Sequence, residues 1–200
     1  MMPTGFAVLL PPWLLLESTH IPSRLTERDD RLRLVNSLAI RNVEERTGGP
    51  FAAIVTDAET GALQSLGVNL VLDSKLSGMH SEMVALQLAN RALGRWDLGA
   101  RGGPGRSVLT TNAQPCLMCL GAVIWSGIGA IEYGLSARMI EELTGYDEGP
   151  MLPDWETECA RRGIEVNGGQ LTAELATVFG EYARRVASGE IAQESGLRRM

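Results

Sequence analysis

The chain has 200 residues, of which 44% are hydrophobic and 21% are charged, with a net charge of −6 and a pI of about 5.0. These values suit one globular domain with terminal extensions. The acidic balance disfavours non-specific nucleic-acid binding, which depends on Lys and Arg contacts with phosphates. Three Cys residues argue against a disulfide framework and favour a reducing compartment, so we expect a cytoplasmic protein.

Residues 1–25 are expected to form an N-terminal arm packed on the body. The apolar run from Leu9 to Leu16 is interrupted by Pro11 and Pro12 and lacks a basic segment before it. It is also shorter than the roughly 18 apolar residues that a transmembrane helix needs. We therefore expect neither a signal peptide nor a membrane partner.

The next segment, up to the first Gly-rich loop, alternates between helical and extended patterns. Apolar residues at helical spacing predict a helix over 26–47, which Thr26 can cap. Buried-strand patterns over 51–56 and 62–68 flank a turn and predict a hairpin. A polar loop, 69–79, then leads to a helix that starts at His80 and ends near Gly94.

The rest of the chain continues the alternation. Residues 95–106 are predicted to be a long surface loop of the kind that often lines a site. The patterns then predict strands over 107–111, 130–133 and 164–166, and helices over 116–125, 136–143, 154–162 and 172–187. This alternation predicts an α/β domain over 26–187, with helices on both faces of a sheet, and a polar tail over 188–200.

Two short motifs predict a zinc site. His80-Ser81-Glu82 precedes Pro115-Cys116-Leu117-Met118-Cys119, and this combination is the signature of zinc-dependent deaminases. His80, Cys116 and Cys119 would bind one zinc ion per chain. Three protein ligands leave a coordination position open, which is the catalytic rather than the structural arrangement. Glu82 is the expected proton carrier.

The spacing within the second motif agrees with a helix. Cys116 and Cys119 share a helical face, and Pro115 fits the first helical position, where its missing N–H is not needed. A structural zinc site is the alternative and needs a fourth protein ligand. Only Cys159 and His20 remain for that role.

Five sequence blocks together resemble the cytidine deaminase-like superfamily, and within it the guanine deaminase branch of bacterial nucleobase deaminases. The blocks are Gly49-Pro50-Phe51-Ala52-Ala53, Gly67-Val68-Asn69, the two metal motifs, and Gly145-Tyr146-Asp147-Glu148-Gly149-Pro150. The last block points to the guanine deaminase branch. The resemblance implies a three-layer fold with a mixed central sheet of about five strands. It also implies a homodimer, in which the C-terminal segment can cross to the partner's pocket.

The resemblance also implies roles for individual residues. Asn69 would hydrogen-bond the edge of the base, and Phe51 would flank its ring. Glu148, or else Asp147, would relay protons to the leaving ammonia. Asn69 could instead be only a turn residue, Phe51 a core residue and Glu148 a solvated loop acid.

Four further positions bear on the substrate. Asn112 and Gln114 stand where the family usually has Ser and Glu, so both are expected to influence which ring is accepted. Tyr146 and Trp96 are loop aromatics that either line the pocket or pack beneath their loops. Ser81 replaces the usual Ala and is small enough to leave the metal site intact.

The predicted function is hydrolytic deamination of a free nucleobase, guanine, to xanthine and ammonia. The alternatives are another amino-azaheterocycle, namely an ammeline-type triazine, cytosine, adenine or a nucleoside, and a tRNA adenosine. An RNA substrate would need a groove of Lys and Arg with stacking aromatics, which the composition disfavours. A non-catalytic zinc domain would have no use for Glu82.

Overall fold

A five-stranded mixed sheet organises the molecule. The computed structural model describes residues 2–99 and 106–191. The strands are β1 (Ala52–Asp57), β2 (Leu63–Val68), β3 (Ser107–Ala113), β4 (Ala130–Leu135) and β5 (Glu165–Asn167), in the order β2-β1-β3-β4-β5. β1 pairs antiparallel with both β2 and β3, whereas β3, β4 and β5 run parallel. The predicted mixed sheet of about five strands is confirmed.

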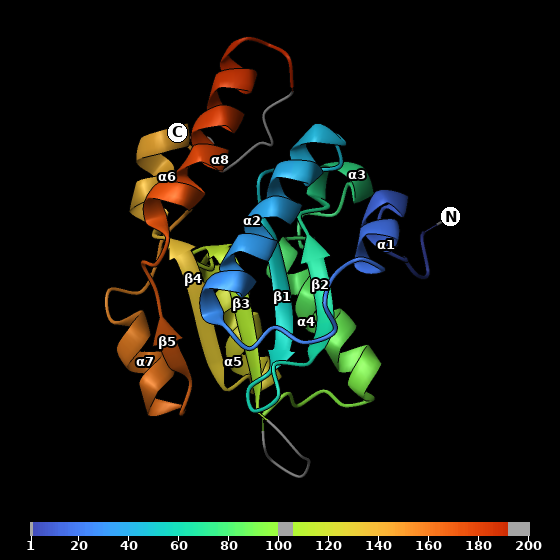
Figure 1. Cartoon of the computed structure of the whole chain (residues 1–200), viewed down its shortest axis with the longest axis vertical. Helices are drawn as coiled ribbons and strands as arrows, with labels where there is room; N and C mark the ends of the chain where they lie inside the picture. The colour runs from blue at the N-terminus through green and yellow to red at the C-terminus, as the bar shows by residue number, and fades with distance from the viewer. Residues whose placement is uncertain (1, 100–105, 192–200) are drawn as a thin grey trace.

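Helices cover both faces of this sheet (Figure 1). α2 (Arg28–Glu44) and α8 (Thr172–Ala187) pack on one face, and α4 (Ser81–Leu93) and α5 (Leu117–Ser126) on the other. α6 (Ala137–Thr144) packs against α8, and α7 (Trp155–Arg161) follows near the β5 edge. Two short helices, α1 (Pro12–Ser18) and α3 (Val71–Ser74), complete the described elements.

Alternate residues of β1, an interior strand of the sheet, enter two separate cores. Ala52 and Ile54 of β1 pack towards α2 and α8, while Ala53 and Val55 pack towards α4 and α5. Successive side chains of a strand point to opposite faces, so a strand buried on both sides reads as a continuous apolar run. This is why the sequence around 51–56 has no polar alternation.

One glycine allows α4 to approach the sheet closely. A Cβ at Gly67 in β2 would lie 2.6 Å from the backbone nitrogen of Ala85 and 2.6 Å from the carbonyl oxygen of Ser81. No real side chain tolerates such contacts, so glycine is required here. The close approach fixes the start of α4, and with it the His80 motif, against the end of β2.

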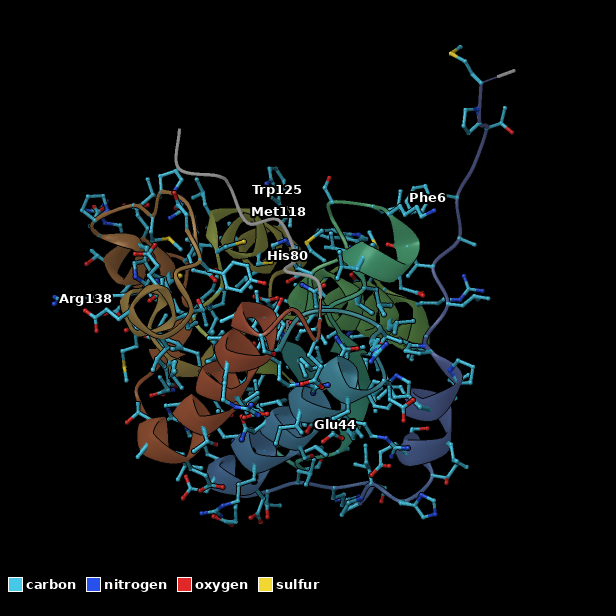
Figure 2. The ribbon with its side chains drawn as sticks, turned by 90° about the horizontal axis from the view of Figure 1, so that it is seen from above. Phe6, Glu44, His80, Met118, Trp125 and Arg138 are labelled. Atoms are coloured by element: carbon cyan, nitrogen blue, oxygen red, sulfur yellow. The ribbon has the colours of Figure 1, made fainter. Side chains whose placement is uncertain are left out.

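The N-terminal arm is partly integrated into the core. Trp13 and Leu14 of α1 are buried with residues of α2 and the sheet. Farther out, Phe6 stands away from the body (Figure 2). No helix in the described ranges is both long enough and apolar enough to cross a bilayer. The predicted tail begins after α8, and its residues 192–200 lie outside the described part of the chain.

Two predicted helix starts differ from the structure. Thr26 does not cap α2, because the N-cap position belongs to Glu27 and has no side-chain hydrogen bond. Pro115 is not in the first turn of α5, which begins at Leu117 with an extended Cys116 as its N-cap (φ −67°, ψ 170°). By contrast, Ser136 caps α6 as the pattern suggests, since its hydroxyl accepts from the Met139 N–H at 3.3 Å.

Candidate active site

The two metal motifs meet at the starts of two neighbouring helices. His80 is the N-cap of α4 and Cys116 the N-cap of α5, and Cys119 lies in the first turn of α5. These starts adjoin the ends of β2 and β3 and the beginning of β1, because β1 runs antiparallel to both neighbours. The sheet topology therefore brings the segments around residues 51, 69, 80 and 115 together at one end of the strands.

The donor atoms of the three predicted ligands are spaced for zinc. His80 Nδ1 lies 3.6 Å from Cys116 Sγ and 3.7 Å from Cys119 Sγ. Tetrahedral zinc with ordinary Zn–N and Zn–S bonds separates its ligands by about 3.6 Å. The three donor atoms all lie within 4.8 Å of one another. The residues present therefore fit the metal.

Neither candidate for a fourth protein ligand joins this group. Within the described ranges, the group of close metal-binding side chains contains His80, Cys116 and Cys119 alone. Cys159 lies on the buried face of α7, and His20 is exposed after α1. The alternative of a structural zinc site therefore has no support in this geometry, and the open position of a catalytic site remains.

Hydrogen bonding makes the cysteine pair a good thiolate donor set. A hydrogen bond from the Cys119 thiol, opposed by burial and helped by His80, lowers the pKa of Cys116 to about 4. The same hydrogen bond and burial raise the pKa of Cys119. Thiolates are the form in which Cys binds zinc, so a bound cation favours loss of the remaining proton.

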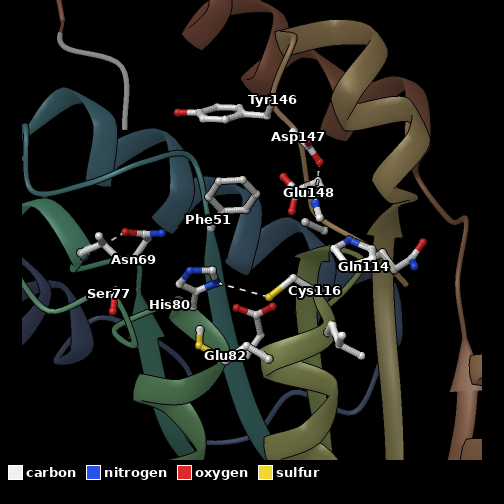
Figure 3. Close-up of a pocket in the computed structure, with 16 residues that line it drawn as sticks. Phe51, Asn69, Ser77, His80, Glu82, Gln114, Cys116, Tyr146, Asp147 and Glu148 are labelled. Atoms are coloured by element: carbon white, nitrogen blue, oxygen red, sulfur yellow. Dashed lines mark hydrogen bonds between the residues drawn. The ribbon is translucent and has the colours of Figure 1, made fainter. Parts of the chain in front are cut away.

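Glu82 lies beside these donors and is almost fully buried. Its carboxylate points towards the gap between His80 and Cys116 (Figure 3). Burial, and next the negative charge of Cys116, raise the pKa of Glu82. The Ser81 hydroxyl donates a 2.9 Å hydrogen bond to Glu82 Oε2. Ser81 was predicted only to be small enough to leave the metal site intact, and this hydrogen bond was not predicted.

A cavity of about 700 Å³ opens over Glu82 and the metal ligands. Its wall contains three carboxyl groups, two aromatic rings, the amide of Asn69 and an apolar edge from the start of α5. These side chains are Glu82, Asp147, Glu148, Phe51, Tyr146, Asn69, Leu117 and Met118. Among the described residues, no Lys or Arg lines it. The cavity suits a neutral flat ring that carries N–H groups.

The orientation of the Asn69 amide follows from its hydrogen bonds. Its Oδ1 accepts from the Val71 N–H at 3.1 Å, and its backbone carbonyl accepts from Asn42 Nδ2 at 2.9 Å. The Asn69 side chain is buried at the cavity wall. With Oδ1 engaged, the Nδ2 group is the part of this amide that can donate to an acceptor on a ligand.

Two acids lie on the loop that follows α6. Asp147 Oδ1 accepts from the Gly149 N–H at 2.9 Å and so belongs to the local turn. Burial, followed by the negative charges of Glu82 and Cys116, raises the pKa of Glu148 to about 7. Glu148 can therefore hold or release a proton near neutrality, which favours it over Asp147 as the second acid.

Two predicted substrate contacts lie outside the cavity wall. Asn112 is fully buried within β3, where Oδ1 accepts from the Ala52 N–H and Nδ2 donates to the Pro50 carbonyl. Trp96 is 76% exposed after the far end of α4. The described part of the predicted loop 95–106 lies at that same far end, and residues 100–105 are outside the described ranges.

Gln114 lines the cavity, but its side-chain amide is directed towards the start of α6. Its Oε1 accepts from the Ala137 N–H at 3.2 Å, at the start of α6 (Figure 3). Ser77, Val71, Gly149 and Pro150 also line the cavity. None of the four was predicted as a site residue, since short segments carry no periodic signal. Gly149 and Pro150 belong to the Glu148 block, and Ser77 and Val71 lie near the His80 motif.

Comparison with known sequences places this geometry in a family. Residues 26–135 match the family described as "Cytidine and deoxycytidylate deaminase zinc-binding region". The chain belongs to this family. The match spans β1 to β4 and therefore includes all three zinc-ligand positions and Glu82.

Individual relatives of this deaminase are similar over most of their length. The chain is 29% identical to guanine deaminase from Bacillus subtilis (strain 168), over 72% of this chain and 87% of that protein. Its fold matches the solved guanine deaminase from Nitrosomonas europaea with a TM-score of 0.84 and 34% identity, covering 92% and 99% of the two chains. It also matches a protein designated NE0047 in complex with 2,6-diaminopurine (TM-score 0.82, 34% identity, 88% and 92% coverage).

Proposed function

We propose that this deaminase converts free guanine and water to xanthine and ammonia. The observation that carries the proposal is a zinc-type donor set and a buried carboxyl beneath a cavity without Lys or Arg in the described wall. The similarity to guanine deaminases supports the choice of base. In the reaction the C2–N bond breaks and a C2–O bond forms. Of the two protons of the water, one ends on the ring nitrogen next to C2 and the other leaves with the amino group as ammonia.

The side chains divide the chemistry as follows. Bound zinc, one per chain, supplies Lewis acidity that makes water a nucleophile near neutral pH. Glu82 takes a proton on its carboxylate and delivers it to the ring nitrogen next to the attacked carbon. Glu148 protonates the leaving amine. One positioned acid–base group is worth roughly 10² to 10⁴ in rate.

Recognition of guanine would use the opposite walls of the cavity. The Nδ2 of Asn69 donates to an acceptor on the base, while the carboxyl groups of Asp147 and Glu148 lie near N–H groups. Phe51 and Tyr146 provide apolar surfaces for a flat ring. Burying an N–H or a carbonyl without a partner is costly, so rings with a different donor pattern are rejected.

The lining charges also argue against nucleotides. A 5′-phosphate would enter a cavity with three carboxyl groups and no described Lys or Arg on the wall. Arg and Lys side chains are the usual partners of anionic phosphates. We therefore propose a free base rather than deoxycytidylate as substrate, although both cytidine and deoxycytidylate appear in the family's description.

An ammonia-release assay tests this function. The zinc-loaded protein is given guanine, adenine, cytosine, ammeline, cytidine and deoxycytidylate at equal concentration. We expect release from guanine and none above background from deoxycytidylate. A protein that turns over cytidine or deoxycytidylate and leaves guanine intact would overturn the assignment.

We also infer that the chain forms a homodimer. Leu117, Met118 and Trp125 on the outer side of α5 are exposed, and no charged residue occurs between Pro115 and Ile131. An uncharged apolar helix face can pair with a second copy of itself. Light scattering should give twice the 21.6 kDa of one chain, and Trp125→Glu should lower that mass.

A further inference from the structure

The helix α8 supports the cavity without lining it. No described residue of α8 is part of the wall. Nevertheless, Phe179 packs edge-on against Phe51 with ring centroids 5.5 Å apart, and Tyr182 stacks on Tyr146 at 5.8 Å. Phe179 and Tyr182 lie three residues apart and so share one side of the helix. Both aromatic rings of the cavity wall therefore rest on α8.

The contact at Tyr182 includes a long-range hydrogen bond. The Tyr182 and Tyr146 hydroxyl groups bond to each other, and the two side chains are only 3% and 5% exposed. They form a small separate core with Val43 of α2. In such a dry environment a hydrogen bond between two hydroxyl groups is stronger than the same bond in water.

This hydrogen bond differs from the local bonds of the loop 145–150. The backbone N–H groups of Tyr146 and Glu148 donate to Thr144 and Glu141 of α6, and that of Gly149 donates to Asp147. These contacts shape the loop relative to α6 and to itself. The Tyr146–Tyr182 bond instead joins the loop to a helix that packs on α2 and on β4.

We propose that Tyr182 is a positioning residue of this enzyme, whose hydroxyl holds Tyr146 and hence the whole loop 145–150 in place against the cavity. The inference rests on the proposed function, because the loop matters through Glu148 and Tyr146. Tyr182 does not touch the substrate. Its hydrogen bond raises the fraction of molecules in which Glu148 and Tyr146 are already in the positions that substrate binding needs.

A positioning role has a distinct kinetic signature. If the loop is correctly placed only part of the time, the apparent affinity for substrate falls by that fraction, while the bound complex reacts as before. The net value of one hydrogen bond corresponds to roughly a 3- to 10-fold effect. Tyr182→Phe should therefore raise KM roughly 3- to 10-fold and leave kcat within about two-fold.

The experiment compares four variants of the full zinc-loaded chain. Tyr182→Phe, Tyr146→Phe and the double variant each remove the same hydrogen bond and keep the rings. Tyr133→Phe is the matched control, since Tyr133 is also buried but contacts Glu156 and lies away from the cavity wall. Steady-state kinetics are measured on the base that the wild type deaminates best, and amide hydrogen exchange is followed in residues 145–150.

The expected result is the same rise in KM for both single variants and the double variant, with faster exchange in the loop and wild-type behaviour in Tyr133→Phe. Effects that multiply in the double variant would overturn the inference, as would unchanged KM and exchange in Tyr182→Phe. A wild type that deaminates none of the tested bases would overturn the proposed function instead, and the exchange measurement would still decide the role of Tyr182.

Discussion

Glu82 is the single carboxyl that the proposed chemistry depends on most. It is 6% exposed, is held by the Ser81 hydroxyl and faces the gap between two metal ligands. An amide has nearly the same shape but cannot carry a proton. The identity of this group, rather than its volume, is therefore what the mechanism needs.

Substituting Glu82→Gln should abolish most of the activity and leave the fold intact. We expect kcat to fall by roughly 10² to 10⁴, which is the usual contribution of a positioned acid–base group. Zinc content and melting temperature should match the wild type. Glu59→Gln is the control, because Glu59 lies in the exposed turn between β1 and β2, at the end of the strands away from the site. Full turnover by Glu82→Gln would contradict the mechanism.

Glu148 predicts a pH dependence with a definite sign. Its pKa rises from 4.5 to about 7 on folding, so the ionised form is disfavoured in the native state. Its contribution to stability is therefore complete below pH 4.5 and is lost as pH rises through about 7. Its proton is likewise lost for catalysis above that pH.

Measurements on Glu148→Gln check both effects. The wild-type kcat should decline above a pH of about 7. The variant should be slower by roughly 10²-fold, and its kcat should not decline in that pH range. Thermal unfolding between pH 5 and 8 should show a decrease in wild-type stability that the variant does not share. An identical pH profile in the two proteins would remove Glu148 from the acid–base chemistry.

The success of sequence reasoning differed between residues for a physical reason. His80, Cys116, Cys119 and Glu82 were predicted together because metal chemistry restricts residue type and spacing at once. Asn112 carries no such restriction. Its amide bonds the backbone at Ala52 and Pro50, a contact that depends on how β3 pairs with β1 and is invisible in the local sequence.

Among the elements, long periodic segments were predicted well and short ones were not. α8 has the predicted bounds, and the strands agree to within two residues at each end. α3 has four residues, too few to show a period, and was read as loop. α1 was predicted only as part of an N-terminal arm packed on the body, although Pro12 at its start fits the first turn of a helix.

A buried ion pair couples α2 to β4. The Arg31 guanidinium donates two hydrogen bonds to the Glu132 carboxylate, at 2.6 and 2.9 Å, and Thr110 donates a third at 2.7 Å. Arg31 and Glu132 are 8% and 6% exposed. No local pattern indicates this pairing, since the two residues lie far apart in the chain.

Removing one partner of this pair should destabilise the fold strongly. Arg31→Met leaves Glu132 buried without its partner, so we expect about 3–5 kcal/mol lost in the free energy of unfolding, measured with urea. The exposed Arg138–Glu142 pair is the comparison, and Arg138→Met should leave the free energy of unfolding nearly unchanged. Similar small losses in both variants would show that the buried pair adds little.

For the molecule as a whole, the metal should act as a link between helices. Its ligands come from α4 and α5, which share a core with β1 and β3. Binding to the native state alone stabilises a protein in proportion to RT ln(1 + [L]/Kd). Chelation should therefore lower the melting temperature, and added zinc should restore it.

Elemental analysis and calorimetry test this link. We expect one zinc per chain in the wild type and in Cys159→Ser, whose thiol is buried away from the ligands. Cys116→Ser should lose the metal and melt near the temperature of the chelated protein. Equal melting temperatures with and without zinc would mean that the metal serves chemistry alone.

The layered α/β architecture followed from the alternation of strand and helix patterns, but the order of strands did not. β1 lies between β2 and β3 because Ala53 and its neighbours pair with residues near Thr111, far along the chain. The support that α8 gives to the cavity is likewise a long-range contact. Local patterns carry no record of such pairings, so the contacts of α8 with Phe51 and Tyr146 could not be predicted.

The ligands sit at the beginnings of α4 and α5, and this has a consequence for how such chains can diverge. α4 extends about 20 Å from His80 before the connection to β3 begins. Residues can be added or removed at that distant end without moving a donor atom. Related proteins can therefore vary the connection after Leu93 in length and composition while the chemistry at the other end is preserved.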